Sequence, residues 1–203
     1  MGRRLDELVN NAGVMWVGPF EQEPEAATRR QVDVNLHGVI RGVKLAAPAM
    51  AARGAGQIIT IASGASKLPP AGEATYAATK HAVYGYLGAV RTELHGSGVR
   101  LSVIMPGVVA TELAAGTDTG PMRRLNPADV AEAVLAAIAR PRFEISVPHR
   151  MGAITRLAAA LPDAARFRLL RTVVPNQLAT GTDMTARRDY ETRAVTDTDG
   201  SPQ

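Results

Sequence analysis

Short apolar runs alternate along the chain with longer segments in which apolar residues recur at helical spacing. The runs are rich in β-branched residues and bounded by Gly, Pro or Asn, which is typical of buried strands. The predicted strands cover residues 8–10, 57–62, 99–105 and 143–147. The predicted helices cover residues 24–53, 75–95 and 127–139. This alternation predicts an α/β fold with a parallel sheet flanked by helices.

The helix boundaries carry their own signals. Pro24 suits the start of the first helix, and Gly54 and Gly56 suit its end. Asn126 followed by Pro127 is typical of a helix N-terminus. The first helix is expected to bury a broad apolar face, formed by Val32, Leu36, Val39, Ile40, Val43 and Leu45.

Residues 148–180 form an amphipathic stretch in which apolar residues are interspersed with Arg. Helices packed over a substrate cleft are the favoured interpretation. A lid, a subunit contact and a membrane-surface anchor stay open as alternatives. The polar sequence after about Arg187 is expected to fray. We therefore divide the chain into a partial catalytic domain (1–148), a helical C-terminal extension (149–190) and a flexible tail (191–203).

Composition narrows the class of protein. The 203 residues are 46% hydrophobic and suit one domain, or one domain with an appendage. The chain has no Cys, which excludes disulfides and fits a reducing cytoplasm. Its net charge of +4 comes from scattered Arg residues, which favours a solvated basic surface over nucleic-acid binding. No apolar run approaches the roughly 20 residues of a membrane span.

Tyr76 and Lys80 stand four residues apart on a predicted helix, so their side chains share one face. A free Tyr has a pKa near ~10, too high for proton transfer at neutral pH. A neighbouring ammonium group is expected to lower the pKa of Tyr76, which would let the pair exchange a proton with an alcohol or carbonyl. The spacing alone is weak evidence, because such pairs occur by chance on many helices.

Ser63 strengthens this interpretation. It ends a predicted strand, where ligand sites of open parallel sheets lie, and it precedes Tyr76 by 13 positions. Its hydroxyl can donate a hydrogen bond to a reacting oxygen. The alternative is a turn or cap residue, which is common for Ser before Gly.

Five ordered elements resemble the short-chain dehydrogenase/reductase family. They are Asn10-Asn11-Ala12-Gly13, Asn35, Ser63, Tyr76-x-x-x-Lys80 and Pro106-Gly107. Their order and the Ser-to-Tyr interval match the family over residues 5–147. The resemblance implies a partial Rossmann-like sheet.

The resemblance also implies roles for these residues. Tyr76 would be the general acid/base, Lys80 would lower its pKa and bind the nicotinamide ribose, and Ser63 would polarise the substrate oxygen. Asn35 would kink its helix and hold a water that connects Lys80 to solvent. The cofactor NAD or NADP would be lined by Asn10, Ala12, Gly13, Tyr76, Lys80, Pro106, Gly107, Val109 and Thr111. No metal is expected.

One family element is not found. The Gly-rich turn Thr-Gly-x-x-x-Gly-x-Gly, which would approach the cofactor pyrophosphate, does not precede Asn10. The residue that chooses between NAD and NADP is also not found. A start codon assigned too far downstream is the favoured explanation, because the catalytic positions are intact, and a truly truncated protein is the alternative. For the chain as given, we expect weak or no nicotinamide binding.

Two functions are weighed on this basis. The first is an NAD(P)-dependent oxidoreductase that transfers hydride on a small alcohol or carbonyl substrate, with Tyr76 as proton donor or acceptor. The apolar segments 68–71 and 113–115 favour a hydrophobic substrate. The rival is a truncated, non-catalytic remnant that serves as an oligomerisation or interaction module. The resemblance further implies a homo-oligomer formed through the helices at 26–53 and 75–95.

Overall fold

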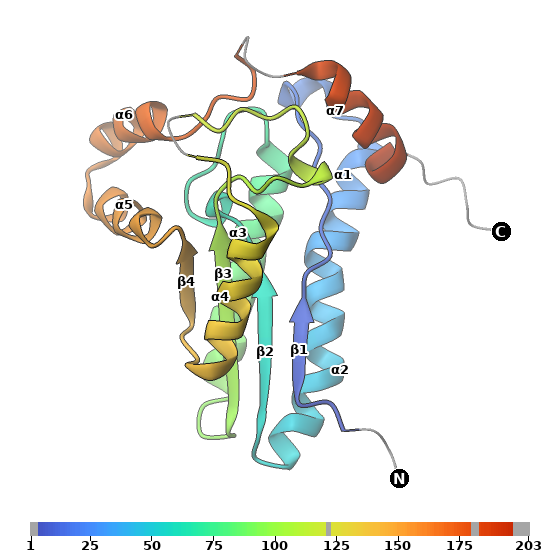
Figure 1. The fold of residues 1–203 in the computed structure, drawn as a ribbon, viewed down its shortest axis with the longest axis vertical. Helices are drawn as coiled ribbons and strands as arrows, with labels where there is room; N and C mark the ends of the chain where they lie inside the picture. Colours follow the sequence, from blue (N-terminus) through green and yellow to red (C-terminus); the bar gives the residue numbers. More distant parts are fainter. Residues whose placement is uncertain (1–3, 121–122, 180–182, 197–203) are drawn as a thin grey trace, which may run out of the picture.

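Four parallel strands form a single sheet in the order in which they occur along the chain (Figure 1). The computed structural model describes residues 4–120, 123–179 and 183–196. The strands are β1 (Glu7–Asn10), β2 (Gly56–Ile61), β3 (Val99–Pro106) and β4 (Glu144–Val147). The predicted α/β class and parallel sheet are therefore confirmed.

The two central strands are those with the most continuous apolar sequence. In β3 every residue except Arg100 is buried, as expected for a strand covered on both faces. Strand β2 pairs with it in register, with Ile59 opposite Ser102. Strand β1 pairs only with β2 within the described residues, and its Val9 remains 42% exposed. The carboxyl ends of all four strands point the same way, which places the loops that follow them at one edge of the sheet.

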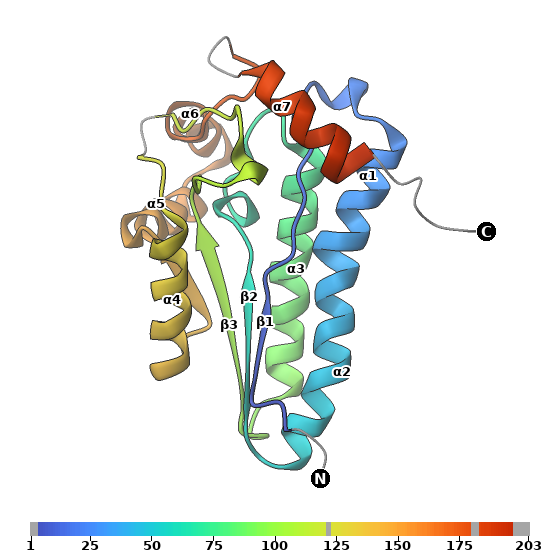
Figure 2. The ribbon, with the colours of Figure 1, turned by 45° about the vertical axis from the view of Figure 1, so that its right-hand side comes forward.

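Helices cover both faces of the sheet (Figure 2). Helices α1 (Glu25–Gln31), α2 (Gly38–Ala52) and α3 (Ala74–Glu93) lie on one side, and α4 (Pro127–Ala139) lies on the other. A π-helical turn (Val32–His37) joins α1 to α2, where the sequence predicts one uninterrupted helix. The bounds of α4 match the prediction, and the Asp129 carboxylate accepts a hydrogen bond from the Asn126 amide at 2.8 Å.

The core lies mainly between α2, α3 and the sheet. Its buried members include Val39, Val43, Met50, Ile58, Val83, Leu87, Leu101 and Val103. The inclusion of Leu45 in this apolar face is wrong, because Leu45 lies on the outer side of α2 and is 83% exposed. It falls two residues after Val43, which turns its side chain about 200° around the helix.

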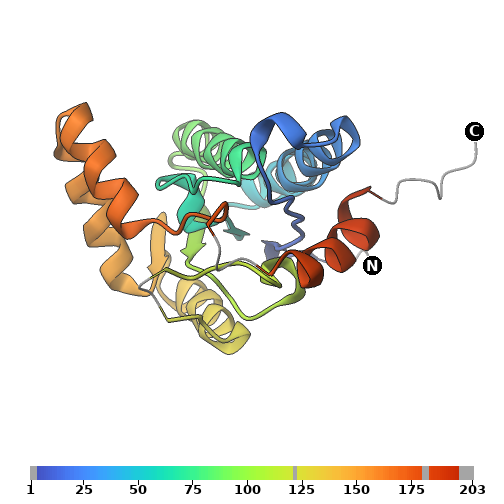
Figure 3. The ribbon, with the colours of Figure 1, turned by 90° about the horizontal axis from the view of Figure 1, so that it is seen from above.

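The C-terminal part contains α5 (His149–Ala160), α6 (Asp163–Val173) and α7 (Met184–Glu191), followed by a π-helical turn (Thr192–Thr196) (Figure 3). Helices α5 and α6 pack on Leu68, in the loop after β2. The prediction that the chain frays after Arg187 differs from the structure up to residue 196. Tyr190 and Val195 are buried against Val14 and Ala27, which fixes this segment by tertiary contacts. Residues 197–203 lie outside the described part.

Among the residues that the structure describes, no helix has the length and apolar character needed to cross a membrane.

The turn before β3 gives a test of the fold. Gly98 has φ +80° and lies so close to Gly54 that a Cβ would overlap the Gly54 carbonyl. We expect Gly98→Ala to lower the free energy of unfolding by about 3 kcal/mol, from backbone strain and steric overlap. Gly96→Ala is the matched control, because Gly96 has φ +78° but open space around it, and should cost about 1 kcal/mol. Urea denaturation of both variants measures the difference; equal losses would contradict the predicted overlap.

Candidate active site

The predicted catalytic residues lie at the carboxyl edge of the sheet, where ligands of doubly wound folds bind. Ser63 follows β2, and Tyr76 and Lys80 lie in the first two turns of α3. The loop after β1 carries Gly13, and the π-helical turn contributes Asn35. Elements far apart in the sequence thus meet in one place because parallel strands end at the same edge.

Tyr76 and Lys80 share one face of α3, as their spacing predicts. The Lys80 Nζ lies 5.5 Å from the centre of the Tyr76 ring and donates a hydrogen bond to the Ile61 carbonyl at 3.3 Å. Both residues are buried, with 7% of Tyr76 and 4% of Lys80 exposed. Lys side chains are rarely buried, and a buried ammonium beside a buried phenol is typical of a functional site rather than of a Tyr–Lys pair on a helix surface.

Ser63 caps the turn after β2 and lies beside Tyr76. Its Oγ accepts a hydrogen bond from the Ala65 amide at 3.1 Å, which caps the 3₁₀ turn Gly64–Ser66. Its hydroxyl also lies near Tyr76 and acts to lower the pKa of the phenol, against the larger effect of burial. The turn therefore holds the Ser63 oxygen next to the phenol oxygen, where a substrate oxygen could contact both.

Asn35 ties the loop after β1 to α3. Its Oδ1 accepts from the Val14 amide at 2.8 Å, and its Nδ2 donates to the Val14 carbonyl at 2.9 Å and to Thr79 Oγ1 at 3.1 Å. The side chain is fully buried. The π-helical turn that carries it is the kind of distortion at which helices bend. Asn35 thereby fixes Gly13 and Val14 beside the catalytic helix.

The predicted cofactor-lining residues fall into two groups. Gly13 lies with the catalytic residues, because a Cβ on it would lie 3.5 Å from Lys80 Nζ and 3.4 Å from Asn35 Oδ1. The others lie at or beyond the strand ends and do not contact Tyr76 through a hydrogen bond. The Asn10 side-chain amide donates to Thr60 Oγ1 at 3.2 Å, and the Gly107 backbone amide donates to the Val147 carbonyl at 2.9 Å. Pro106 ends β3, and Val109 forms a β-bridge with Leu125. Ala12 and Thr111 are exposed.

Burial dominates the pKa shifts of the two candidate catalytic groups, Tyr76 and Lys80. It raises the pKa of Tyr76, and the nearby Glu73 carboxylate adds to this shift while the Ser63 hydroxyl opposes it. Burial also lowers the pKa of Lys80 to about 8. The expectation that Lys80 lowers the pKa of Tyr76 differs from the structure, because burial of the phenol dominates and raises that pKa, while the Lys80 ammonium lies 5.5 Å from the ring centre.

Glu73 is a buried acid beside this site that the sequence analysis did not identify. It precedes Tyr76 by one helical turn and is only 7% exposed. Burial raises its pKa to about 7, and the attraction of Arg187 opposes the rise. The spacing of three residues from Tyr76 was the available signal, since residues i and i+3 share a helix face. Its partner Arg187 lies 114 positions further along the chain and gave no local signal.

The raised pKa of Glu73 gives a pH test. In the unfolded chain this acid ionises near 4.5, whereas in the folded chain it keeps its proton up to about 7. Stability contributed by the neutral form is therefore complete below pH 4.5 and is lost as the pH rises through 7. We expect Glu73→Gln to be more stable than the wild type by about 3 kcal/mol at pH 8 and equally stable at pH 4.

The exposed Glu21→Gln is the control for Glu73→Gln and should change stability at neither pH. Urea denaturation at both pH values measures the four differences. A Glu73→Gln variant that loses stability at pH 8 would show instead that the charged carboxylate makes a favourable contact.

Comparison with known proteins defines the class to which this fold and site belong. The sequence pattern of the short chain dehydrogenases matches residues 1–121, more than half of the chain. An uncharacterized oxidoreductase of Staphylococcus saprophyticus is 34% identical over 138 residues, covering 68% of this chain and 59% of that protein. The chain therefore belongs to the short-chain dehydrogenase/reductase family.

Solved structures agree with this assignment. A short chain dehydrogenase from Burkholderia cenocepacia in complex with NADP superposes with a TM-score of 0.71 at 28% identity, over 81% of this chain and 68% of that one. A short chain dehydrogenase/reductase from Burkholderia phymatum in complex with NAD gives a TM-score of 0.69 at 28% identity, over 77% and 66%. The match spans about three fifths of the length of the Staphylococcus saprophyticus protein.

Proposed function

We propose that this chain provides the proton-transfer part of an NAD(P)-dependent oxidoreductase that acts on a small alcohol or carbonyl substrate. The observation that carries the proposal is that the half-buried Ser63 lies with the buried Tyr76 and Lys80 at the carboxyl edge of the sheet. Oxygen-bearing donors that converge there suit a substrate oxygen that gains or loses a proton.

In the reducing direction, Tyr76 donates its proton to the substrate oxygen. The raised pKa of Tyr76 keeps the phenol protonated at neutral pH, which is the form that a general acid needs. Ser63, which lies near Tyr76, orients the same substrate oxygen. Lys80 supplies positive charge beside the phenol as the proton leaves, since with a pKa of about 8 it is protonated at pH 7.

The residues around Lys80 fit the nicotinamide end of a dinucleotide. Lys80 Nζ donates one hydrogen bond to the Ile61 carbonyl and can offer its remaining protons to ribose hydroxyls. Gly13 approaches Nζ without a side chain of its own, so backbone and ligand can come close there. When bound, the nicotinamide supplies or accepts the hydride. Relatives solved with NAD and with NADP support either dinucleotide.

The surroundings of Tyr76 in this site are mainly apolar. Met15, Val17, Ala65 and Ala77 pack around Tyr76, and Leu113 lies against the same cluster. Glu73 is the buried polar exception beside them. These neighbours support a small substrate with an apolar body and a single reacting oxygen.

Titration of the purified chain with NADH and NADPH, followed by nicotinamide fluorescence, tests the proposal. We expect weak but saturable binding that Lys80→Ala weakens about tenfold or more, because it removes charged hydrogen bonds to the cofactor. Lys44→Ala is the matched control, since Lys44 is an exposed lysine on α2. Binding that is equal in all three proteins, or absent from all of them in folded form, would reject the assignment of Lys80.

We also propose that copies of this chain associate through α2 and α3. The exposed Leu45 on α2 supports this, because an 83% exposed leucine on a long helix gains by being covered. Multi-angle light scattering tests the assembly, with Leu45→Lys as the variant expected to lower the mass. A monomeric mass for the wild type would refute it.

A further inference from the structure

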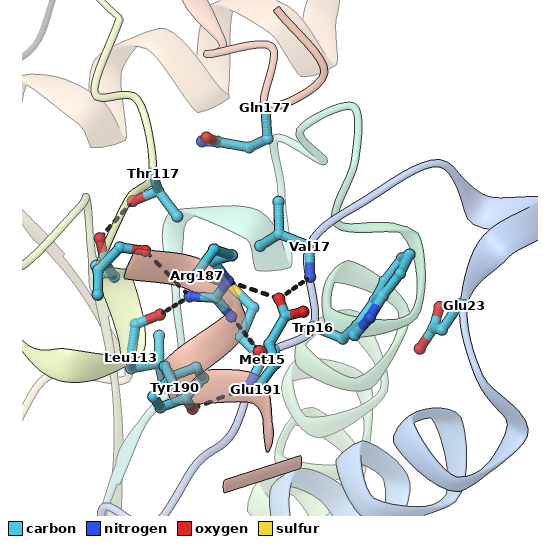
Figure 4. Close-up of polar contacts among 12 residues, drawn as sticks. Met15, Trp16, Val17, Glu23, Leu113, Thr117, Gln177, Arg187, Tyr190 and Glu191 are labelled. Atoms are coloured by element: carbon cyan, nitrogen blue, oxygen red, sulfur yellow. Dashed lines mark hydrogen bonds and ion pairs between the residues drawn. The ribbon is translucent and has the colours of Figure 1, made fainter. Parts of the chain in front are cut away.

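Helix α7 lies across the carboxyl edge of the sheet (Figure 2), and its side chains contact two loops of the site (Figure 4). Asp183 caps the helix by accepting hydrogen bonds from the Thr185 and Ala186 amides at 3.0 and 3.2 Å. Its own amide donates to the Gly116 carbonyl at 2.8 Å. This anchors the first turn of α7 on the loop that follows β3.

Arg187 is the centre of this contact and is fully buried. Its guanidinium donates to the carbonyls of Leu113 at 2.6 Å and of Ala115 at 3.4 Å, and also to the carbonyl of Met15. Its Nε pairs with Glu191 at 2.7 Å. One side chain therefore holds the loop after β1 to the loop after β3, as Figure 4 shows.

The other polar residues of α7 bind the same loop in return. Glu191 Oε1 accepts from the Val17 amide at 2.9 Å, and the Tyr190 hydroxyl accepts from the Met15 amide at 3.3 Å. Backbone amides in an active-site loop are thus satisfied by side chains from the far end of the chain. Exchange of these amides with solvent will report directly on whether α7 is in place.

A buried ion pair is a costly way to hold a helix, because both charges lose their water. Such a pair contributes little net stability, yet it specifies one arrangement, since the charges are satisfied only when every partner is in position. The Arg187–Glu191 pair with its loop carbonyls is satisfied in the closed position. The contacts of Arg187 are therefore complete in this position of α7 and are lost if the helix moves away.

The closed position fills space beside the catalytic lysine. A Cβ on Gly13 would lie 3.5 Å from Lys80 Nζ and 3.8 Å from Leu113 Cδ1, so the Leu113 side chain and the ammonium face the same small space. Arg187 holds the backbone of Leu113 there. A nicotinamide ribose at Lys80 would need that space.

We propose that α7 is an autoinhibitory latch, in which Arg187 and Glu191 hold the Met15 and Leu113 loops closed, and that a nicotinamide dinucleotide binds only when the latch is released. The inference rests on the proposed function, because it takes Lys80 as the contact for the cofactor. In the released state the dinucleotide binds at its intrinsic affinity. The apparent affinity of the whole population equals that intrinsic affinity multiplied by the fraction of molecules in the released state.

The test combines hydrogen–deuterium exchange with cofactor titration in the full chain. Arg187→Met removes the guanidinium and keeps the aliphatic stem, and Arg188→Met is the matched control on the exposed side of the same helix. We expect Arg187→Met to speed exchange in residues 14–18 and 184–191 about tenfold or more, and to tighten binding of NADH or NADPH about tenfold. Arg188→Met should change neither. Circular dichroism verifies folding, and Glu191→Gln gives the same directions with smaller effects should Arg187→Met fail to fold.

The outcomes separate the latch from the proposed function. Weaker cofactor binding in Arg187→Met than in Arg188→Met would overturn the inference, since Arg187 would then support the site. Faster amide exchange in Arg187→Met with an unchanged, measurable affinity for NADH and NADPH would show that closure of α7 does not compete with the dinucleotide. The latch would then be rejected and the proposed function would stand. Faster exchange with no nicotinamide binding in any variant would overturn both.

Discussion

Replacing Tyr76 by Phe is expected to lower turnover of a carbonyl substrate by about 10²–10⁴-fold, the usual contribution of a general acid. The hydroxyl is the only group lost, because Phe keeps the ring that packs with Met15, Val17 and Ala77. The hydroxyl is the proton source in the proposed mechanism, and it lies near Ser63 and Lys80. Loss of absorbance of the reduced nicotinamide, with a panel of small aldehydes and ketones, measures the rate.

Tyr84→Phe is the control for this experiment. Tyr84 lies two turns further along α3, and its hydroxyl donates to the Glu144 carboxylate rather than to a site residue. Its loss should leave turnover unchanged. Because Lys80 and Gly13 stay unchanged, Tyr76→Phe should still bind NADH and NADPH. A Tyr76→Phe variant that keeps more than about a tenth of the activity would assign the proton transfer to another group.

Much of the fold could be predicted because local pattern and tertiary environment agree. β2 and β3 are continuous apolar runs, and both lie in the middle of the sheet. α4 begins where Asn126 and Pro127 predict, since its first turn is stabilised by residues adjacent in sequence. In such elements, residues that are close in sequence determine where the helix or strand begins and ends.

The C-terminal end could not be predicted in this way. The sequence of α7, with two arginines and few apolar residues, predicts a solvated tail. Its position is set by Arg187 and Tyr190, whose partners lie about 170 residues earlier in the chain. A local pattern contains no information on such contacts, so a buried arginine is indistinguishable from an exposed one until the fold brings its carbonyl partners together.

The candidate site shows the same division. Ser63, Tyr76 and Lys80 could be identified because their order and spacing along two adjacent elements resemble a family. Glu73 could not, because an acid next to a helix start is normally exposed. It is buried here since the loops after β1 and β2 meet beside it, with the Gly18 amide donating to the Gly72 carbonyl at 3.0 Å. Its raised pKa is a consequence of that meeting.

Asn35→Ala is expected to lower the free energy of unfolding by about 4 kcal/mol. The substitution leaves the buried amide and carbonyl of Val14 without the partner that satisfies both, and each orphaned group costs about 1–3 kcal/mol. For a chain of this length, such a loss corresponds to a fall in Tm of roughly 10 °C. Thermal and urea denaturation measure the two quantities independently.

Asp33→Ala is the matched control, because Asp33 lies in the same π-helical turn. Its carboxylate pairs with His37 at 3.0 Å on the surface, where such pairs contribute about 0–1 kcal/mol. A loss of about 4 kcal/mol in Asn35→Ala with almost none in Asp33→Ala would show that Asn35 holds the loop after β1 to the catalytic helix. Losses of similar size would mean that the turn itself, and not the side-chain amide of Asn35, provides that attachment. The position of Gly13 beside Lys80 would then be set by the helix geometry alone.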